Sequence, residues 1–559
     1  MKQEFDVKIK GNTISVSQGT TFETIAERYR DEYDSPIMLA YFNGRYRELF
    51  KRISEDGVLE FVTFREKSGF MTYRRSVILL MLKSLHSVKS VETKNATAHV
   101  LFTMDNAYYC ELFSGDTKIP VSGEMLSEIE NHMRRLVKED VPFMKHTVHV
   151  EKAKKIFTER SLPDKKRLFE YRRSSNVNIY NLDGYEDYFY GYMLPHTGLI
   201  GGFELKLHGD GFFLKMSTVD EPYGNVHEMK FRPKLFDQML NGSKWAFTMD
   251  MATIGALNDR IVSGDMEDMI LAQDAVQERE IAQIARTIAE DGSKKFILIA
   301  GPSSSGKTTF AHRLSVQLYA QGMHPHPIGL DDFFINREDM IPQPDGSLDF
   351  EDISVLDIEE FNNVCERLLA GEEVDMPTFN FLEGRREYRG KKLKMEEDDI
   401  LVIEGIHGLN PRTTYRLPDE NKFRVYISAL TQLKVDEHNC VSTRDGRLIR
   451  RMIRDDRTRG NNAQTTLKRW DSVGSGEERH IFPYQENADV MFNSALIYEL
   501  PILKPYVEPL LFAVPKDSPE YPEAKRLLKF LDYCLPYPSE AIEKNSILRE
   551  FIGGSCFNV

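Results

Sequence analysis

The stretch Gly301-Pro302-Ser303-Ser304-Ser305-Gly306-Lys307-Thr308 decides the fold of much of this chain. An almost continuous apolar run, Lys295 to Ala300, precedes it, and a helical pattern from Lys307 to Gln321 follows it. The spacing GxxxxGKT between a buried strand and a helix is typical of a phosphate-binding loop. Main-chain N–H groups of such a loop wrap phosphates, and the helix N-terminus adds a favourable dipole. The sequence therefore predicts a nucleoside triphosphate site.

The residues of this loop share one predicted role, contact with ATP. They are Gly301, Ser303, Ser304, Ser305, Gly306, Lys307, Thr308 and Thr309. Lys307 is expected at the terminal phosphates as a catalytic group, and Thr308 is expected to place its hydroxyl on Mg²⁺. ATP and Mg²⁺ are therefore the predicted cofactors.

Acidic residues follow two further apolar segments. Asp331 and Asp332 come after Pro327 to Leu330, at the end of an expected strand where open α/β sheets bind ligands. Asp331 is the predicted catalytic base and a neighbour of the metal and substrate, with Asp332 as the competing choice. Glu404 ends the apolar strand Ile400 to Ile403 and is the second predicted metal-side carboxylate.

An arginine-rich segment, Arg447 to Arg459, places Arg447, Arg450, Arg454 and Arg457 on one helical face. Such a face can neutralise charge on a transferred phosphoryl group, so Arg450 and Arg454 are predicted catalytic residues. A solvated charged helix and an RNA-binding patch remain alternatives, because the only acids within the segment are Asp455 and Asp456.

The composition of the 559 residues is that of a globular protein with several domains, at 41% hydrophobic and 29% charged residues. No apolar run is long enough to span a bilayer, and the charged start, Met1 to Lys10, lacks the apolar segment of a secretion signal. We expect a cytoplasmic protein without a membrane partner. A net charge of −14 disfavours general nucleic-acid binding, and the five scattered cysteines suggest neither disulfides nor a thiolate zinc site.

The rest of the chain indicates smaller α+β units and a connecting helix. Short strands and one helix near Thr21 are expected up to Phe64, followed by helices over Arg74 to His86 and Glu124 to Lys138. Short strands are expected in Val141 to Phe157 and in Tyr180 to His208. An apolar stripe from Asp265 to Asp291 predicts one amphipathic helix, and no chemistry is evident beyond about Leu500.

Several motifs together resemble the uridine kinase and phosphoribulokinase family over roughly Lys294 to Leu500. They are the phosphate loop, Leu330-Asp331-Asp332-Phe333-Phe334, Asp349-Phe350-Glu351-Asp352, Pro377-Thr378-Phe379-Asn380-Phe381, Ile403-Glu404-Gly405 and Arg447 to Gly460. The resemblance implies that Asp331 acts as the base, that Thr308 and Glu404 act at magnesium, and that the arginine-rich helix forms a lid over the phosphates.

The resemblance also implies an acceptor site. Glu351 stands where the family's aspartate holds the ribose hydroxyls, and Phe379 and Phe381 match the aromatic positions beside the base. The family's pyrimidine-contacting histidine falls at Gly384, so a nucleoside kinase is implied more firmly than a uridine kinase. Arg385, beside the aromatic pair, is a predicted substrate contact and keeps a sugar-phosphate acceptor open.

The N-terminal half resembles parts of threonyl-tRNA synthetases. Residues 1–65 resemble their TGS domain, and residues 66–220 resemble their second additional, editing domain. The family's paired histidines fall within Thr72 to Val77, which has none, and its cysteine falls at Phe189, so zinc-dependent editing is not expected. His196 alone is expected to be structural.

These observations predict an α/β P-loop kinase domain, a parallel sheet with helices on both faces, after two α+β domains of which the first is β-grasp-like. The expected divisions are 1–65, 66–220, a connecting region 221–292, the kinase domain 293–500 and a helical extension 501–559.

The leading hypothesis is an ATP-dependent nucleoside kinase acting on the 5′-hydroxyl of a uridine- or cytidine-like nucleoside. The alternatives are a sugar-phosphate kinase and a nucleotide-controlled regulator that binds tRNA or other RNA through the N-terminal domains. A homo-oligomer is left open.

Overall fold

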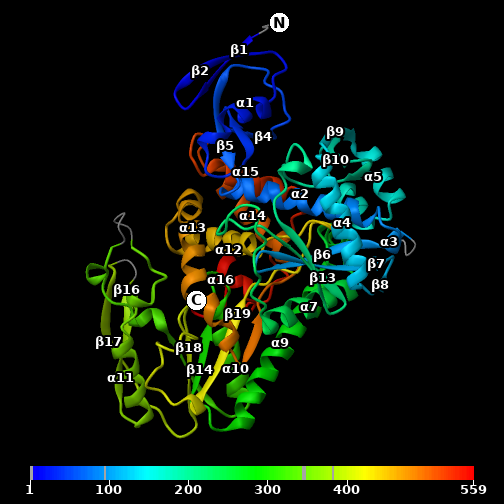
Figure 1. Ribbon diagram of the computed structural model, residues 1–559. Helices are drawn as coiled ribbons and strands as arrows, with labels where there is room; N and C mark the ends of the chain where they lie inside the picture. Colours follow the sequence, from blue (N-terminus) through cyan, green and yellow to red (C-terminus); the bar gives the residue numbers. More distant parts are fainter. Residues whose placement is uncertain (1–3, 93–95, 343–347, 381–382) are drawn as a thin grey trace.

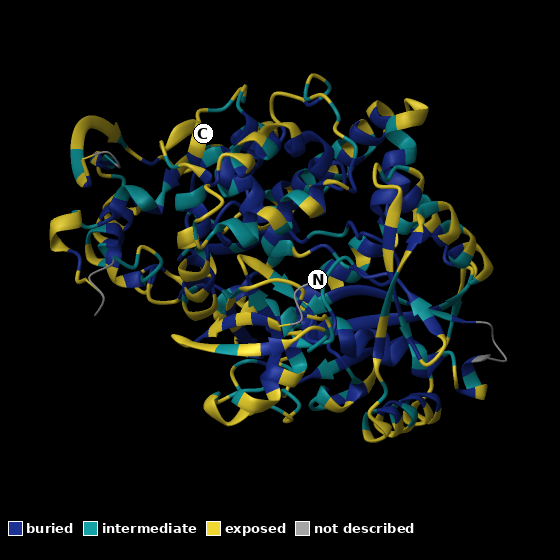
Figure 2. Ribbon diagram, turned by 90° about the horizontal axis from the view of Figure 1, so that it is seen from above, coloured by how far each residue is buried: buried dark blue, intermediate teal, exposed yellow. Residues whose placement is uncertain are grey.

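The computed structural model describes residues 4–92, 96–342, 348–380 and 383–559 (Figure 1). Viewed from above, buried residues gather along strands and inward helix faces, whereas exposed residues mark the outer turns (Figure 2). No helix in the described ranges is long and apolar enough to cross a membrane.

The N-terminal unit is a five-stranded sheet in the order β2-β1-β5-β3-β4, packed on one helix. Its elements are β1 (Glu4–Ile9), β2 (Asn12–Ser17), α1 (Phe22–Tyr29), β3 (Ile37–Phe42), β4 (Arg45–Arg47) and β5 (Gly57–Thr63). Alternate residues of β1 are buried, so that Phe5, Val7 and Ile9 face the core. Thr21 caps α1 by accepting a hydrogen bond from the Thr24 N–H at 3.2 Å. This is the small α+β unit that the sequence predicts.

The second unit contains two antiparallel sheets with helices against them. Its helices are α2 (Lys67–Leu85), α3 (Lys89–Glu92), α4 (Gly123–Glu139), α5 (Val150–Glu159) and α6 (Pro163–Glu170). Its strands are β6 (Thr97–Met104), β7 (Ala107–Ser114), β8 (Thr117–Ile119), β9 (Phe143–His149), β10 (Asn176–Leu182), β11 (Tyr185–Asp187), β12 (Phe203–His208) and β13 (Gly211–Met216). One sheet runs β12-β13-β7-β6 with β8 beside β7, and the other runs β11-β10-β9.

The prediction of short strands through Phe157 was wrong for its second half, which is helix α5. The His149 side chain accepts a hydrogen bond from the Glu151 N–H and so caps this helix. Ala153 and Phe157, four residues apart, then share its buried face. Helix α2 also begins seven residues before the predicted start at Arg74.

Three helices, rather than one, connect the second unit to the parallel sheet. They are α7 (Pro233–Thr248), α8 (Ile254–Ser263) and α9 (Met266–Asp291), of which only α9 was predicted. Its buried positions include Ile281, Ile284 and Ile288, as the apolar stripe requires.

The largest sheet has five parallel strands in the order β15-β18-β14-β19-β20. Its strands are β14 (Phe296–Ala300), β15 (His324–Gly329), β18 (Asp399–Glu404), β19 (Lys422–Ser428) and β20 (Val490–Asn493). Its helices are α10 (Lys307–Ala320), α11 (Ile358–Leu369), α12 (Thr443–Thr458) and α13 (Ala463–His480), and β16 (Val374–Asn380) and β17 (Arg385–Leu393) form a separate hairpin.

Alternate residues of β14 point to opposite sides of this sheet. Ile297 and Ile299 pack in one core with α9 and α10. Phe296 and Leu298 pack in another core with α11 and β16. Both faces are therefore covered, as Figure 1 shows, and the predicted doubly covered α/β sheet is confirmed.

The last segment folds back onto the sheet domain. Its helices are α14 (Glu499–Phe512), α15 (Tyr521–Leu531) and α16 (Leu548–Ile552). Ile547 and Phe551 join the core beneath β14 and α10. The C-terminal segment is therefore part of the sheet domain's packing.

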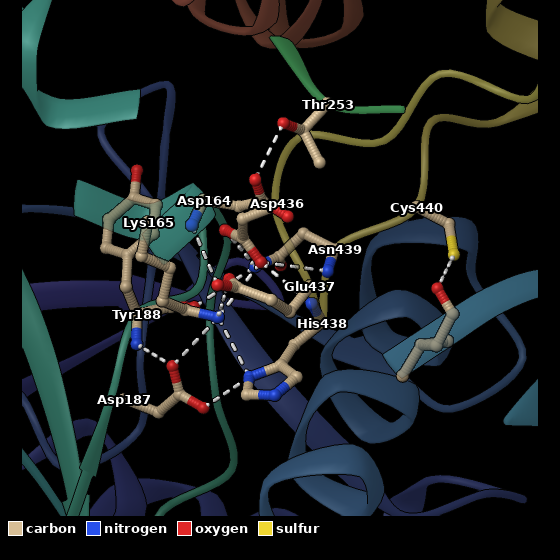
Figure 3. Close-up of polar contacts among 11 residues, drawn as sticks. Asp164, Lys165, Asp187, Tyr188, Thr253, Asp436, Glu437, His438, Asn439 and Cys440 are labelled. Carbon is tan, nitrogen blue, oxygen red and sulfur yellow. Dashed lines mark hydrogen bonds and ion pairs between the residues drawn. The ribbon is translucent and has the colours of Figure 1, made fainter. Parts of the chain in front are cut away.

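Buried charges join the second unit to the loop of residues 434–440, which follows β19 (Figure 3). The Lys165 ammonium of α6 lies 2.9 Å from Asp436 Oδ1 and 3.2 Å from Asp187 Oδ1, and none of these three side chains is exposed. Burial alone would lower the pKa of Lys165, but Asp187, Asp436 and Glu437 hold it above its usual value. Lys165 therefore remains charged between the two units.

Main-chain bonds fix the same loop on both sides. Lys434 donates its N–H to Ala252 O at 2.8 Å, and Val100 donates its N–H to Glu437 O at 2.9 Å. The loop is thus bonded to the second unit and to the connecting helices at once.

We predict that Lys165→Met strongly destabilises the full chain, because it leaves Asp187 and Asp436 buried without their cation. Loss of one partner of a buried pair costs about 3–5 kcal/mol. The adjacent and exposed Lys166 provides the matched control Lys166→Met. Urea unfolding measures both, and equal midpoints for the two variants would contradict the prediction.

Candidate active site

Two glycines allow the loop between β14 and α10 to adopt its shape. A Cβ at Gly301 would lie 1.9 Å from Ile427 O on the neighbouring strand. Gly306 has φ +84° and a Cβ there would lie 2.6 Å from Ile547 Cγ2. Ser304 also has a positive φ, +59°, which costs energy for a residue with a side chain.

The loop offers unpaired polar groups that fit a phosphate. The hydroxyls of Ser304 and Ser305 are buried and have no hydrogen-bond partner in the part of the chain that the structure describes. Lys307 turns its ammonium onto the loop, donating to Gly301 O at 3.1 Å. Buried polar groups are normally paired, so these hydroxyls indicate a ligand with acceptor oxygens, such as the phosphates of ATP.

Helix α12 supports the loop through a buried ion pair. Arg447 and Glu477 of α13 are 4% and 1% exposed, and Arg447 Nη2 donates to Glu477 Oε2 at 2.7 Å. Glu477 Oε1 accepts the Ser303 N–H at 2.9 Å, and Arg447 donates to Ser303 O at 3.1 Å. Arg451 donates to Ser303 Oγ at 2.7 Å. Ser303 is thus held on both sides of its peptide.

The predicted catalytic Arg450 lies in a different environment from the one expected. Its side chain is fully buried, forms an ion pair with Glu499 and donates to Ser494 O at 2.9 Å. Its contact with the phosphate loop is a hydrogen bond from Nη1 to Ser304 O at 3.4 Å. The structure therefore shows Arg450 bracing the loop backbone, while a direct phosphate contact stays a prediction.

Arg454 leads to the C-terminal segment. Its Nη1 lies 3.8 Å from Glu550 Oε1, and burial lowers its pKa to about 10. Glu550 Oε2 accepts the hydroxyl of Thr309 at 2.9 Å. The segment beyond Leu500, in which no chemistry was evident from the sequence, therefore reaches the loop helix, because Glu550 contacts both that helix and the arginine helix.

The predicted metal-side residues meet at the start of α10. Thr308 Oγ1 donates to Glu404 Oε1 at 2.8 Å. Burial raises the pKa of Glu404 to about 7. The charge of Lys307 opposes this rise, and the charge of Asp331 adds to it. A hydroxyl and carboxylates in this arrangement provide the oxygen ligands that Mg²⁺ prefers. Thr308, Glu404 and Asp331 could therefore hold the ion beside the phosphates.

Asp331 and Asp332 differ in their bonding. Asp332 Oδ1 accepts the Phe379 N–H at 3.1 Å and so supports strand β16. The Asp331 carboxylate accepts no hydrogen bond within the described ranges. Burial raises its pKa, and the positive charge of Lys307 is the largest influence that opposes this rise. The Asp331 carboxylate is therefore the less constrained of the two, and its role as the base stays a prediction.

Glu351 lies against Gly476 of α13. A Cβ at Gly476 would lie 2.5 Å from Glu351 Cβ, so only glycine permits this approach. Burial raises the pKa of Glu351 to about 7, and the charges of Arg451, Lys307 and Asp331 all act on it. Glu351 and Asp331 are therefore brought to one site.

The remaining predicted acceptor residues differ in where the structure places them. Phe379 is buried against Phe334, with ring centroids 5.7 Å apart. Phe381 lies outside the described residues. Arg385 is 61% exposed on the hairpin and pairs with Glu383 and Glu387, so the structure does not bring it to the other site residues.

The C-terminal and N-terminal halves of the chain resemble different known proteins. The model of the phosphoribulokinase / uridine kinase family matches residues 296–498. Residues 296–498 are a domain of this family. The predicted resemblance over Lys294 to Leu500 is thereby confirmed, and this kinase-family domain contains most of the loop, acid and arginine residues described above.

The N-terminal region is homologous to threonine–tRNA ligases. The ligase of Caldanaerobacter subterraneus subsp. tengcongensis is 25% identical over 248 residues, 44% of this chain and 37% of the ligase. That of Syntrophomonas wolfei is 28% identical over 189 residues, 34% of this chain and 29% of the ligase. This chain therefore spans well under half the length of these relatives.

A solved structure described as a possible uridine kinase from Bacillus stearothermophilus is 22% identical, with a TM-score of 0.24. The match covers 36% of this chain and 89% of that one.

Sequence reasoning missed three acids that serve the kinase-family domain: Glu477, Glu499 and Glu550. Each neutralises an arginine of α12. The arginine-rich segment was judged short of balancing acids because only its own acids were counted. An excess of buried-face arginines is itself a signal that acids must come from elsewhere.

We predict a pH-dependent effect of Glu404→Gln on the stability of the nucleotide-free chain. The pKa of Glu404 is about 7 in the folded chain, against an ordinary value of 4.5. Between pH 4.5 and pH 7 the folded chain therefore holds a proton on Glu404 that the unfolded chain has lost. Wild-type stability should therefore fall, relative to that of the variant, as the pH rises from 4.5 to 7. Thermal unfolding in a chelator across this range measures it, and parallel curves would contradict the assignment.

Proposed function

We propose that this chain is an ATP- and Mg²⁺-dependent nucleoside kinase that phosphorylates the 5′-hydroxyl, with uridine or cytidine as the leading acceptors. The observation that supports it is the convergence of Asp331 and Glu351 beside the phosphate loop of a kinase-family domain. Glu351 would hold the ribose hydroxyls and Asp331 would receive the 5′-hydroxyl proton. Phe379 would contact the base.

The proposed reaction is direct transfer. The 5′-oxygen forms a bond to the γ-phosphorus as the bond from that phosphorus to the bridging oxygen breaks, ADP leaves, and the proton passes to Asp331. Lys307 would neutralise charge on the phosphates, the arginines of α12 would hold the loop in place, and the loop N–H groups would orient the phosphates. Thr308, Glu404 and Asp331 would hold Mg²⁺, which would supply positive charge beside the phosphates.

The pairing of the hairpin arginines favours an acceptor without a phosphate. Arg385 is bound by Glu383 and Glu387, and Arg386 donates to Asp357 Oδ2 at 2.9 Å. A sugar phosphate needs unbalanced cations at its phosphate. A sugar-phosphate kinase is therefore the weaker proposal.

The N-terminal half carries a separate proposal. The separate sheets of the fold support the divisions 1–65, 66–220 and 221–292 before the kinase domain 293–500 and the extension 501–559. The homology to threonine–tRNA ligases supports a contact with tRNA. Salt-sensitive binding of tRNA to the full chain would support that contact.

We predict that Asp331→Asn lowers turnover on nucleosides by about a hundredfold or more while ATP binding persists, because general-base catalysis contributes about 10²–10⁴-fold. A coupled ADP-release assay against nucleosides and ribulose 5-phosphate measures turnover, and calorimetry measures ATP binding. Asp332→Asn is the matched control and should retain more activity. Undiminished turnover in Asp331→Asn would remove the base role.

A further inference from the structure

A second cluster of metal-ligating side chains lies next to Glu351. One ligand atom from each of Asp349, Asp352 and His480 lies within 4.8 Å of the other two. His480 Nε2 is 3.5 Å from Asp352 Oδ2. Two ligands of one tetrahedral zinc ion lie roughly 3.3–3.6 Å apart when bonds are about 2.0–2.2 Å long. One edge of such a site is thus already formed.

The two carboxylates are held in place by the backbone. Asp349 Oδ1 accepts the Glu351 N–H at 3.0 Å, and Asp352 Oδ1 accepts the Ser354 N–H at 2.8 Å. Each carboxylate therefore has one oxygen fixed by the backbone, and the other oxygen of Asp352, Oδ2, faces His480. Asp349 Oδ2 accepts Arg479 Nη2 at 3.1 Å, so this arginine is the present cation at the cluster. The side chains of Asp349 and His480 are only 9% and 18% exposed.

A buried histidine beside the cluster supplies an independent indication of a ligand. His407, which follows strand β18, is 2% exposed, and neither of its ring nitrogens has a hydrogen-bond partner within the described ranges. The charges of Asp352 and Asp349 and the Asp352 backbone all act on this ring, so His407 lies beside the cluster. The lone pair of an imidazole nitrogen is the group that binds a metal ion.

The two histidine rings lie near one another, farther apart than on a shared ion. Their centroids are 6.4 Å apart at 76°. With metal–nitrogen bonds of about 2.1 Å, two imidazoles on one tetrahedral ion have centroids roughly 5.3 Å apart. His407 would therefore have to move about 1 Å closer to reach an ion bound by the other three side chains.

We propose that Asp349, Asp352, His407 and His480 form a second metal site, for a divalent transition metal with Zn²⁺ as the leading ion. Mixed imidazole and carboxylate ligands suit Zn²⁺, whereas Mg²⁺ prefers oxygen alone. The ion would join the loop that carries Glu351 to the end of α13 and to the loop after β18. The site goes beyond the proposed phosphotransfer and does not depend on it.

Equilibrium dialysis of the full chain against Zn²⁺ with metal analysis tests the site. The experiment uses excess Mg²⁺ and no nucleotide, so that the phosphate-loop site does not take Zn²⁺, and a Cys556→Ser background, because that thiol is exposed. We expect one Zn²⁺ per chain, and a loss of affinity of about tenfold or more in His480→Gln and in Asp352→Asn. Failure of the kinase assay would leave this result unaffected.

Two matched controls separate the metal site from a simple ion pair. Arg479→Gln removes the cation that competes for Asp349, so Zn²⁺ affinity should be kept or increased. His324→Gln removes a histidine paired with Asp399 at the other end of the sheet, so affinity should not change. Unfolding midpoints in a chelator establish that each variant folds. Absence of Zn²⁺ binding in the wild type, or equal binding in His480→Gln and Asp352→Asn, would overturn the proposal.

Discussion

The buried Arg447–Glu477 pair is the interaction on which the phosphate loop depends. Ser304 has a positive φ, and such a conformation persists only where its surroundings enforce it. The pair binds the N–H and the carbonyl of Ser303, and Arg450 reaches Ser304 O. A buried pair also costs desolvation energy, so its presence here is better explained by the specific geometry it imposes than by stability. The arginine helix thus shapes the phosphate loop.

The same helix connects the loop to the N-terminal half. Residues 434–440 are bound by Lys165 and by main-chain hydrogen bonds with Val100 and Ala252, and α12 begins three residues after them. A continuous series of contacts therefore runs from the ligase-like unit to Ser303. The position of the N-terminal unit and the shape of the phosphate loop are joined by buried contacts.

Local signals in the sequence were sufficient for strands β14 and β18 of the sheet and for the loop. The apolar run before Gly301, the GxxxxGKT spacing and the acid after Ile403 depend on neighbouring residues only, and β14, α10 and Glu404 lie as predicted. The partners of the arginines were not predictable in this way. Glu477, Glu499 and Glu550 lie 30 to 96 residues from their partners, and only the folded chain brings them together.

The same reason explains the remaining errors. Nothing near Ile547 or Glu550 suggests a phosphate site, because their role arises from the return of the C-terminal segment to α10. Lys165 belongs to an ordinary basic run, Lys165-Lys166-Arg167, and only burial distinguishes it from Lys166. Arg385 looked like a substrate contact by its place beside aromatic residues, while its own strand neighbours neutralise it.

The affinity of the full chain for Mg²⁺-ATP, measured by calorimetry in Glu477→Gln and in the control Glu478→Gln, tests the account most directly. Glu478 is the exposed neighbour of Glu477 on the same helix. The account predicts that Glu477→Gln weakens ATP binding by about tenfold or more, since loss of a charged hydrogen bond costs roughly 1.5–3 kcal/mol, while Glu478→Gln binds as the wild type does. Equal ATP affinity in a folded Glu477→Gln and in Glu478→Gln would contradict it.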